Sequence, residues 1–321
     1  MAGKLREVAF LLDGTNGGEC HQLKKKNKED QAIEMLEQSR WPNGPFCPFC
    51  GSTSAYRLNS DPASKTRKGL CKCRDCRKQF SVTVGTIFHG SKIPIHKWMT
   101  VLHLMTASKK GISALQISRM MGITYKSAWF MCHRVRHAMS EGPLSVKLRG
   151  VVEVDETYVG GKNKNRPISP RFREGAKKKI PVIALVQRGG NVRSFKIKNA
   201  GVKELRKAIE ENVDRQSWLM TDQWKAYTPI GRGYQSHEAV NHSALEYVRG
   251  NVYTNTAESY FSLLKRGIIG TFHNISEKHL DRYNDEFAFR WNMRKSTDGE
   301  RAMAALRAVE GKRLTYKAPT A

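Results

Sequence analysis

Residues 151–161 read VVEVDETYVGG, a run rich in β-branched residues that closes on two glycines. This composition predicts a strand followed by a turn. Two further strands are predicted over residues 180–190 (IPVIALVQRGG) and 191–199 (NVRSFKIKN), and a fourth over residues 217–227 (SWLMTDQWKAY). Residues 202–213 (VKELRKAIEENV) have the apolar spacing of an amphipathic helix. Strands and helices mixed in this way predict an α/β domain.

Three acidic residues of this region are candidates for a catalytic metal site. Asp155 and Asp222 follow apolar stretches that are expected to be buried, so each carboxylate would lie at the edge of a sheet. Glu258 lies in a predicted helix over residues 256–268, and Lys265 follows it by seven residues, about two turns further along the same face. Carboxylates brought together need cations, and their oxygen atoms suit Mg²⁺ or Mn²⁺ in a two-metal site for phosphoryl transfer.

Each of these residues also has an ordinary structural interpretation. An aspartate at the end of a strand often forms a turn, and Glu156, Asp285 and Glu286 are rival acids that composition does not exclude. Lys265 adjoins Arg266, so it could equally be solvated surface charge.

Two CxxC pairs predict a zinc site nearer the N-terminus. Cys47 and Cys50 form CPFC, and Cys73 and Cys76 form CRDC after 22 intervening residues. Two such knuckles suit a tetrahedral Zn²⁺ ion, and the flanking period-two runs predict a small β-ribbon. The alternative is that these thiols are redox-active or bind no metal. Cys71, two residues before Cys73, is a second candidate for the ligand position assigned to Cys73. Basic residues including Arg74 and Lys78 surround the knuckles, which favours contact with DNA phosphates.

The residues between this ribbon and the α/β region have helical spacing. Residues 97–111, 112–122 and 123–142 predict three helices, with a glycine near the end of each. The last two resemble a helix-turn-helix, whose second helix would present Lys126 near its start to DNA. A plain helical linker is the alternative, because the motif is degenerate.

The overall charge indicates a polyanionic partner. The 321 residues include 56 Lys and Arg against 29 Asp and Glu, a formal net charge of +27. The excess extends along the whole chain, including a basic, loop-like segment at residues 162–179. Nucleic acid is therefore the expected partner. No apolar run approaches the ~20 residues of a membrane span, and the N-terminus lacks a signal-peptide core, so we expect a cytoplasmic protein and no membrane partner.

Several of these motifs together resemble a known family. The stretches RWPNGPFCPFCGS, KCRDCRKQFSVTVGTIF, VEVDETYVGGK, TDQWKAY, NTAESYFSLLKRGIIGTFH and DEFAFRWNMR are similar, in order, to bacterial insertion-sequence DDE transposases of the zinc-ribbon type, which are related to the Merlin superfamily. This resemblance implies an RNase H-like fold and a DDE triad of Asp155, Asp222 and Glu258. It also implies that Asn255, in the N-x-x-E signature, and Lys265 support the triad or contact DNA, and that the protein is nucleoid-associated.

The sequence thus predicts a multidomain DNA transposase. We expect it to bind the terminal inverted repeats of an insertion sequence, to cut these DNA ends and to join their 3′-hydroxyls to target DNA as a homodimer or higher oligomer. An inactive DNA-binding regulator and a metal-dependent nuclease without strand transfer are the alternatives. The expected parts are an N-terminal arm (1–28), a β zinc ribbon with a preceding helix (29–90), an all-α helix-turn-helix region (91–145), an RNase H-like α/β domain (146–300) and a C-terminal tail (301–321).

Overall fold

The computed structural model of the chain describes residues 27–58, 69–140, 146–160, 179–241, 244, 246 and 248–316. The predicted arm at residues 1–28 and the basic segment at residues 162–179 lie almost wholly outside this part of the chain. The described residues form two units. One holds the residues up to Met139 together with those from Ser296 onwards, and the other holds the residues from Ser140 to Lys295.

The first unit begins with a helix and the predicted ribbon. Helix α2 (Lys28–Arg40) starts at Asn27, whose side chain accepts a hydrogen bond from the backbone N–H of Asp30 at 2.8 Å. Three short strands follow and pair antiparallel in the order β1-β2-β3. The strands are β1 (Ala55–Arg57), β2 (Leu70–Cys73) and β3 (Gln79–Ser81).

Three helices follow the ribbon, as the sequence predicted. They are α3 (Ile95–Ala107), α4 (Ala114–Met121) and α5 (Tyr125–Met139). Gly122 ends α4 in the left-handed conformation at φ 61°, and Ile117 of α4 is fully buried. The helical segment is therefore present, and its use as a helix-turn-helix remains a prediction.

The C-terminal residues pack into this first unit. Helix α11 (Asp298–Arg307) buries Ala302, Ala305 and Leu306 and packs against α3. The guanidinium of Arg40 donates hydrogen bonds to the carbonyl oxygens of Val82 and Val84, each at 2.7 Å, and to the carboxylate of Glu310 at 3.4 Å. The predicted boundary at residue 300 thus lies inside α11. Residues 301–316, expected to be a tail, are part of a packed core because their apolar side chains are buried there.

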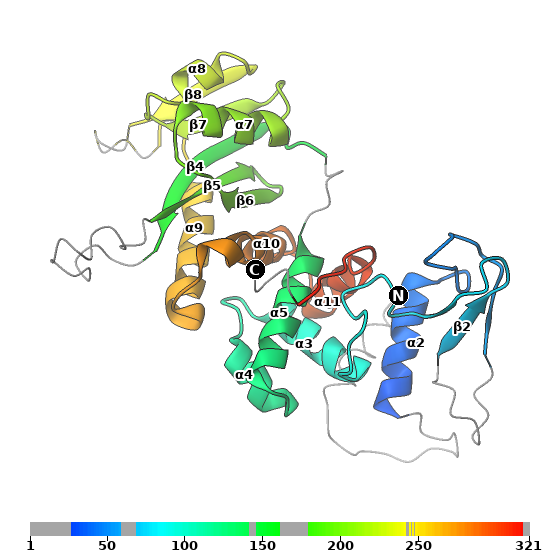
Figure 1. The fold of residues 1–321 in the computed structure, drawn as a ribbon. Coiled ribbons are helices and arrows are strands. Elements are labelled where there is room, and N and C mark those ends of the chain that lie inside the picture. Colours follow the sequence, from blue (N-terminus) through cyan, green and yellow to red (C-terminus); the bar gives the residue numbers. More distant parts are fainter. Residues whose placement is uncertain are drawn as a thin grey trace. The chain divides into compact units, whose positions relative to one another are not determined.

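The second unit contains a five-stranded mixed sheet in the order β6-β5-β4-β7-β8 (Figure 1). Strands β4, β5 and β6 pair antiparallel, whereas β7 pairs parallel with both β4 and β8. The four predicted strands are present. The fifth strand, β8, was missed because the sequence SHEAV lacks an apolar run. The strands are β4 (Val151–Val159), β5 (Ile180–Gln187), β6 (Val192–Lys196), β7 (Trp218–Asp222) and β8 (Ser236–Val240).

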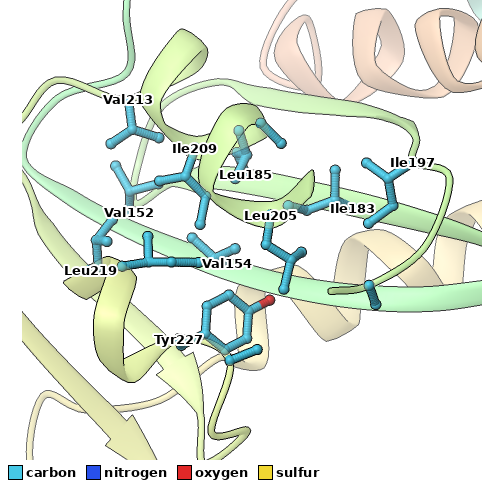
Figure 2. Packing of buried hydrophobic residues seen from close by; sticks show 14 of the residues in the cluster. Val152, Val154, Ile183, Leu185, Ile197, Leu205, Ile209, Val213, Leu219 and Tyr227 are labelled. Atoms are coloured by element: carbon cyan, nitrogen blue, oxygen red, sulfur yellow. The ribbon is translucent and has the colours of Figure 1, made fainter. Parts of the chain in front are cut away.

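Helices cover both faces of this sheet. Helix α7 (Val202–Asn212) covers one face, where Leu205 and Ile209 pack with Val154 and Leu185 (Figure 2). Helices α9 (Asn255–Gly267) and α10 (Leu280–Asn292) cover the opposite face, which is lined by alternate residues of the same strands (Figure 1). The remaining elements of this unit are α8 (Thr228–Gly231), the π-helical turn η3 (Ile268–Phe272) and the 3₁₀ turn η4 (Glu277–His279).

The core on the α9 face is a separate apolar cluster. Its strand residues include Val182, Ala184 and Val186 of β5, and its helix residues include Tyr260 and Leu264 of α9. Because β-strand side chains alternate, residues 153, 155, 157 and 159 of β4 face this side. Within the described residues, no helix combines the length and apolar character that a membrane crossing requires.

Candidate functional site

Four cysteines of the ribbon form a metal-binding cluster. The Sγ atoms of Cys47 and Cys76 lie 3.5 Å apart, and those of Cys50 and Cys73 lie 3.7 Å apart. All four sulfur atoms lie within 4.8 Å of one another. Sulfur atoms at the corners of a tetrahedron around Zn²⁺ would be about 3.8 Å apart, given a Zn–S distance of ~2.3 Å. The predicted ligand set is therefore brought together and fits structural zinc.

Each pair of cysteines occupies a similar turn. Gly51 and Arg77 directly follow the second cysteine of their pairs, and both have positive φ, at 76° and 57°. Although burial opposes ionisation of Cys47, the backbone N–H groups of Phe49 and Cys50 lower the pKa of its thiol to about 7. The pKa of Cys50 in the same turn is raised to about 12, because burial and the neighbouring thiols of Cys47, Cys76 and Cys73 oppose its ionisation. Cys71, the alternative candidate to Cys73 as a metal ligand, is buried and does not belong to the cluster.

The two basic residues of the ribbon that are predicted to contact DNA, Arg74 and Lys78, each make a cation–π contact with an exposed aromatic ring. The guanidinium of Arg74 lies 5.5 Å from the ring centre of Tyr56, and the ammonium of Lys78 lies 5.2 Å from that of Phe49. Both rings are exposed at the surface. In the helical segment, the ammonium of Lys126 similarly lies 5.1 Å from the ring of Tyr316. These stacked cations are held near the surface, where a phosphate backbone can reach them.

Two of the three candidate acids lie on neighbouring strands of the mixed sheet. Glu153 of β4 pairs in parallel register with Met220 of β7. Asp155 and Asp222 each follow two residues later, so they lie at the same level on the same face of the sheet. The carboxylate of Asp155 accepts a hydrogen bond from the N–H of Glu156 at 2.8 Å, and that of Asp222 accepts one from Trp224 at 3.1 Å.

Glu156 follows Asp155 on β4. Burial, with a smaller contribution from the carboxylates of Asp222 and Asp155, raises the pKa of the Glu156 carboxyl to about 8. By strand alternation, Glu156 faces the α7 side, where Tyr227 lies in the core (Figure 2). The side chain of this rival acid therefore leaves the strand on the face opposite to Asp155.

Helix α9 carries the remaining candidates. Glu258 lies in its first turn, and Asn255 is its first residue. Lys265 lies in its last turn, about 10 Å further along the axis at the helical rise of 1.5 Å per residue. All three side chains are exposed to solvent. The predicted Glu258–Lys265 spacing on one helix is therefore present.

The other two rival acids lie on α10. Glu286 is fully buried and pairs with Arg290, one turn later on the same helix. This pairing gives Glu286 a structural role. Burial raises the pKa of the Tyr260 hydroxyl well above its usual value, and the nearby carboxylate of Asp285 raises it further. Neither residue lies on the strands that hold Asp155 and Asp222.

A buried ion pair beside these acids was missed from the sequence. Glu153 is fully buried on β4, and its carboxylate accepts a hydrogen bond from the Nε atom of Arg188 at 2.7 Å. The same carboxylate accepts hydrogen bonds from the backbone N–H groups of Thr256 and Ala257 at the start of α9. A charged residue inside the otherwise apolar VVEV run was the available signal, because such a residue needs a buried partner.

The three acids differ from the cysteines in how closely they are gathered. Among the His, Cys, Asp and Glu side chains that the structure describes, the four cysteines form the group whose ligand atoms are close enough together, all within 4.8 Å of one another, to hold one metal ion. Asp222 ends β7, whereas Asp155 lies in the middle of β4, so the expectation that Asp155 lies at the edge of the sheet is wrong; β4 continues to Val159 because it pairs with β5 from Val152 to Val159. Glu258 lies on the helix that packs against β4.

Comparisons with known proteins match both parts of this arrangement. Residues 27–79 match a transposase zinc-ribbon domain, and residues 147–292 match an ISXO2-like transposase domain. An uncharacterized protein in transposable element ISH50 of Halobacterium salinarum is 30% identical over 274 residues, which cover 82% of this chain and 90% of that relative. The first matched segment contains the four cysteines, and the second contains Asp155, Asp222 and Glu258.

Proposed function

Because this chain belongs to the ISXO2-like DDE transposases with a zinc-ribbon domain, we propose that it cuts the ends of its own mobile element and joins them to target DNA. The observation that supports this most directly is the placement of Asp155 and Asp222. They lie at one level on adjacent parallel strands, on the sheet face that α9 packs against.

Asp155, Asp222 and Glu258 are the proposed DDE triad within an RNase H-like domain. Asp155 and Asp222 supply carboxylate oxygens from strands, and Glu258 supplies one from the first turn of α9. The donor set consists of oxygen ligands only, and the negative charges of these carboxylates attract cations. This set fits Mg²⁺ or Mn²⁺ rather than a softer metal. Such ions, when bound, supply Lewis-acid stabilisation and nucleophile activation for phosphoryl transfer.

The residues around the triad would hold DNA at the correct position. Lys265, exposed on α9, would contact a phosphate of the bound strand, and Asn255, one turn before Glu258 on the same helix, would support the triad or contact DNA. Positioning of this kind is most of what a protein contributes to phosphoryl transfer. No side chain of the protein needs to form a covalent bond with DNA.

The first unit would supply recognition of the element ends. Its zinc ribbon presents Arg74 and Lys78, and its helical segment presents Lys126 at the start of α5. In our proposal the α4–α5 pair acts as a helix-turn-helix on double-stranded DNA. Two element ends have to be held together during transposition, so we propose a homodimer or higher oligomer on DNA.

One experiment tests this function against its alternatives. Purified protein is incubated with labelled DNA that carries the ends of the element, a target plasmid and Mg²⁺, and the products are separated by size. We expect cut ends and end–target joined molecules. Cutting without joining would identify a nuclease, and binding without cutting would identify an inactive regulator.

A further inference from the structure

We propose that the buried ion pair between Glu153 and Arg188 positions Glu258 relative to Asp155 by fixing the start of α9 to β4. Glu153 and Arg188 would then be positioning residues of the active site that do not themselves touch metal or DNA. This inference rests on the proposed function, since it takes Asp155 and Glu258 as ligands of the same divalent ions.

The carboxylate of Glu153 replaces the usual cap of helix α9. The N-cap residue Thr254 makes no side-chain capping hydrogen bond. Glu153 instead accepts hydrogen bonds from the backbone N–H groups of Thr256 at 2.8 Å and Ala257 at 3.1 Å, and from the Thr256 hydroxyl at 2.9 Å. The negative charge also lies at the positive end of the helix dipole.

Arg188 fixes the chain that leads into this helix. Its Nη1 atom donates to the carbonyl oxygen of Asn251 at 2.6 Å, and its Nη2 atom donates to that of Tyr253 at 2.8 Å. Its guanidinium also stacks 3.5 Å from the ring centre of Tyr253. A planar guanidinium can make all these contacts at once, whereas a lysine ammonium cannot.

The contacts are adjacent to the candidate catalytic acids on both elements. On β4, Asp155 follows Glu153 by two residues and leaves the same face of the strand. On α9, Glu258 directly follows Ala257, whose N–H is bound to Glu153. The ion pair therefore joins the strand and the helix at the points from which the two acids project.

Helix capping alone does not require such a pair. A serine, threonine or aspartate at the N-cap satisfies the same N–H groups locally, and a buried ion pair is often no more stable than apolar packing. What this pair adds is a fixed geometry between two elements that are about 100 residues apart in the chain. Partners behind a metal ligand commonly change metal affinity about 10- to 100-fold when mutated.

Two conservative variants test this role in the full-length protein. Arg188→Lys keeps the positive charge but loses the planar guanidinium that donates several hydrogen bonds at once. Glu153→Gln keeps an acceptor oxygen but loses the negative charge. Arg193→Lys is the matched control. Arg193 also lies in the sheet and donates to two backbone carbonyl oxygens, those of Val146 at 2.6 Å and Asn212 at 3.4 Å, on the α7 face.

Two measurements separate positioning from general stability. The first is the rate of amide hydrogen exchange in residues 254–262. The second is the Mn²⁺ concentration at half-saturation of the DNA-free protein (the Mn²⁺ midpoint), measured by electron paramagnetic resonance. In Arg188→Lys and Glu153→Gln, we expect faster exchange in that segment and a Mn²⁺ midpoint raised about 10-fold. Arg193→Lys should lower the melting temperature without moving the midpoint. If Arg188→Lys does not fold, Glu153→Gln decides the outcome by the same two readings.

The reference variant Glu258→Gln distinguishes two kinds of failure. If Glu258→Gln weakens Mn²⁺ binding while Arg188→Lys and Glu153→Gln bind Mn²⁺ like wild type, the positioning role is refuted and the triad stands. If Glu258→Gln itself leaves Mn²⁺ binding unchanged, the proposed role of Glu258 in the active site is refuted instead.

Discussion

Asp155 and Asp222 lie level with each other on the parallel strands β4 and β7, each two residues beyond the register pair Glu153–Met220. They are 67 positions apart in the sequence, and parallel pairing brings Asp222, at the end of β7, beside Asp155 in the middle of β4.

Removing the charge of Asp155 or of Asp222 should separate catalysis from binding. We expect Asp155→Asn or Asp222→Asn to reduce cleavage of element ends by at least about 10²-fold, because the substitution removes a charged ligand from the site of phosphoryl transfer. DNA binding should persist or tighten, since a like charge near the phosphates is lost. Cleavage assays and electrophoretic mobility shifts on the same preparations measure both effects.

Glu211→Gln is the matched control for this pair, because Glu211 is an exposed acid of α7 on the other face of the sheet. It should cut like wild type. A double variant, Asp155→Asn with Asp222→Asn, that still cut DNA in Mg²⁺ would show that the triad is wrongly assigned.

The cysteine cluster predicts opposite outcomes for two neighbouring residues of β2. Cys73 and Cys71 are both fully buried, but only Cys73 belongs to the cluster. Cys73→Ala should abolish zinc binding and unfold residues 45–90, because a ribbon of this size depends on the metal for its stability. Cys71→Ala should retain zinc. Metal analysis of purified protein gives the stoichiometry, and equal zinc content in both variants would contradict the assignment.

Lys265 should act as a single phosphate contact. We expect Lys265→Ala to weaken complex formation and to reduce the slope of log K against log salt by about 0.9, the value for one contact with duplex DNA. The control is Lys207→Ala, an exposed lysine of α7, which should leave the slope unchanged. A wild-type slope and wild-type strand transfer in Lys265→Ala would identify this residue as surface charge only.

The packing of α11 predicts that the C-terminal residues stabilise the first unit. Leu306 of α11 is buried, so Leu306→Ala should lower the free energy of unfolding of that unit by about 2–5 kcal/mol. Arg307→Ala, at the exposed next position, should change it by less than about 0.5 kcal/mol. Chemical denaturation of both variants measures the difference, and equal stability would mean that α11 is a dispensable tail.

Local patterns in the sequence were sufficient for much of this protein. The spacing of Cys47, Cys50, Cys73 and Cys76 predicted the metal cluster, because each CxxC turn is closed by hydrogen bonds within a few residues. The apolar runs predicted β4, β5, β6 and β7, and helical periodicity predicted α3, α4, α5, α7 and α9. The positions of these elements could be predicted because the alternation of a strand and the 3.6-residue repeat of a helix are patterns among neighbouring residues, which the sequence records directly.

Long-range pairing decided the rest, and no local pattern encodes it. Strand β8 exists because its polar sequence completes a sheet edge beside β7, and α11 belongs to the first unit because its apolar face is buried against α3. Glu153 appeared in the sequence as one charge in an apolar run. Only the tertiary structure brings Arg188 and the start of α9 to it, because a buried charge is stable only where distant parts of the chain supply its partners.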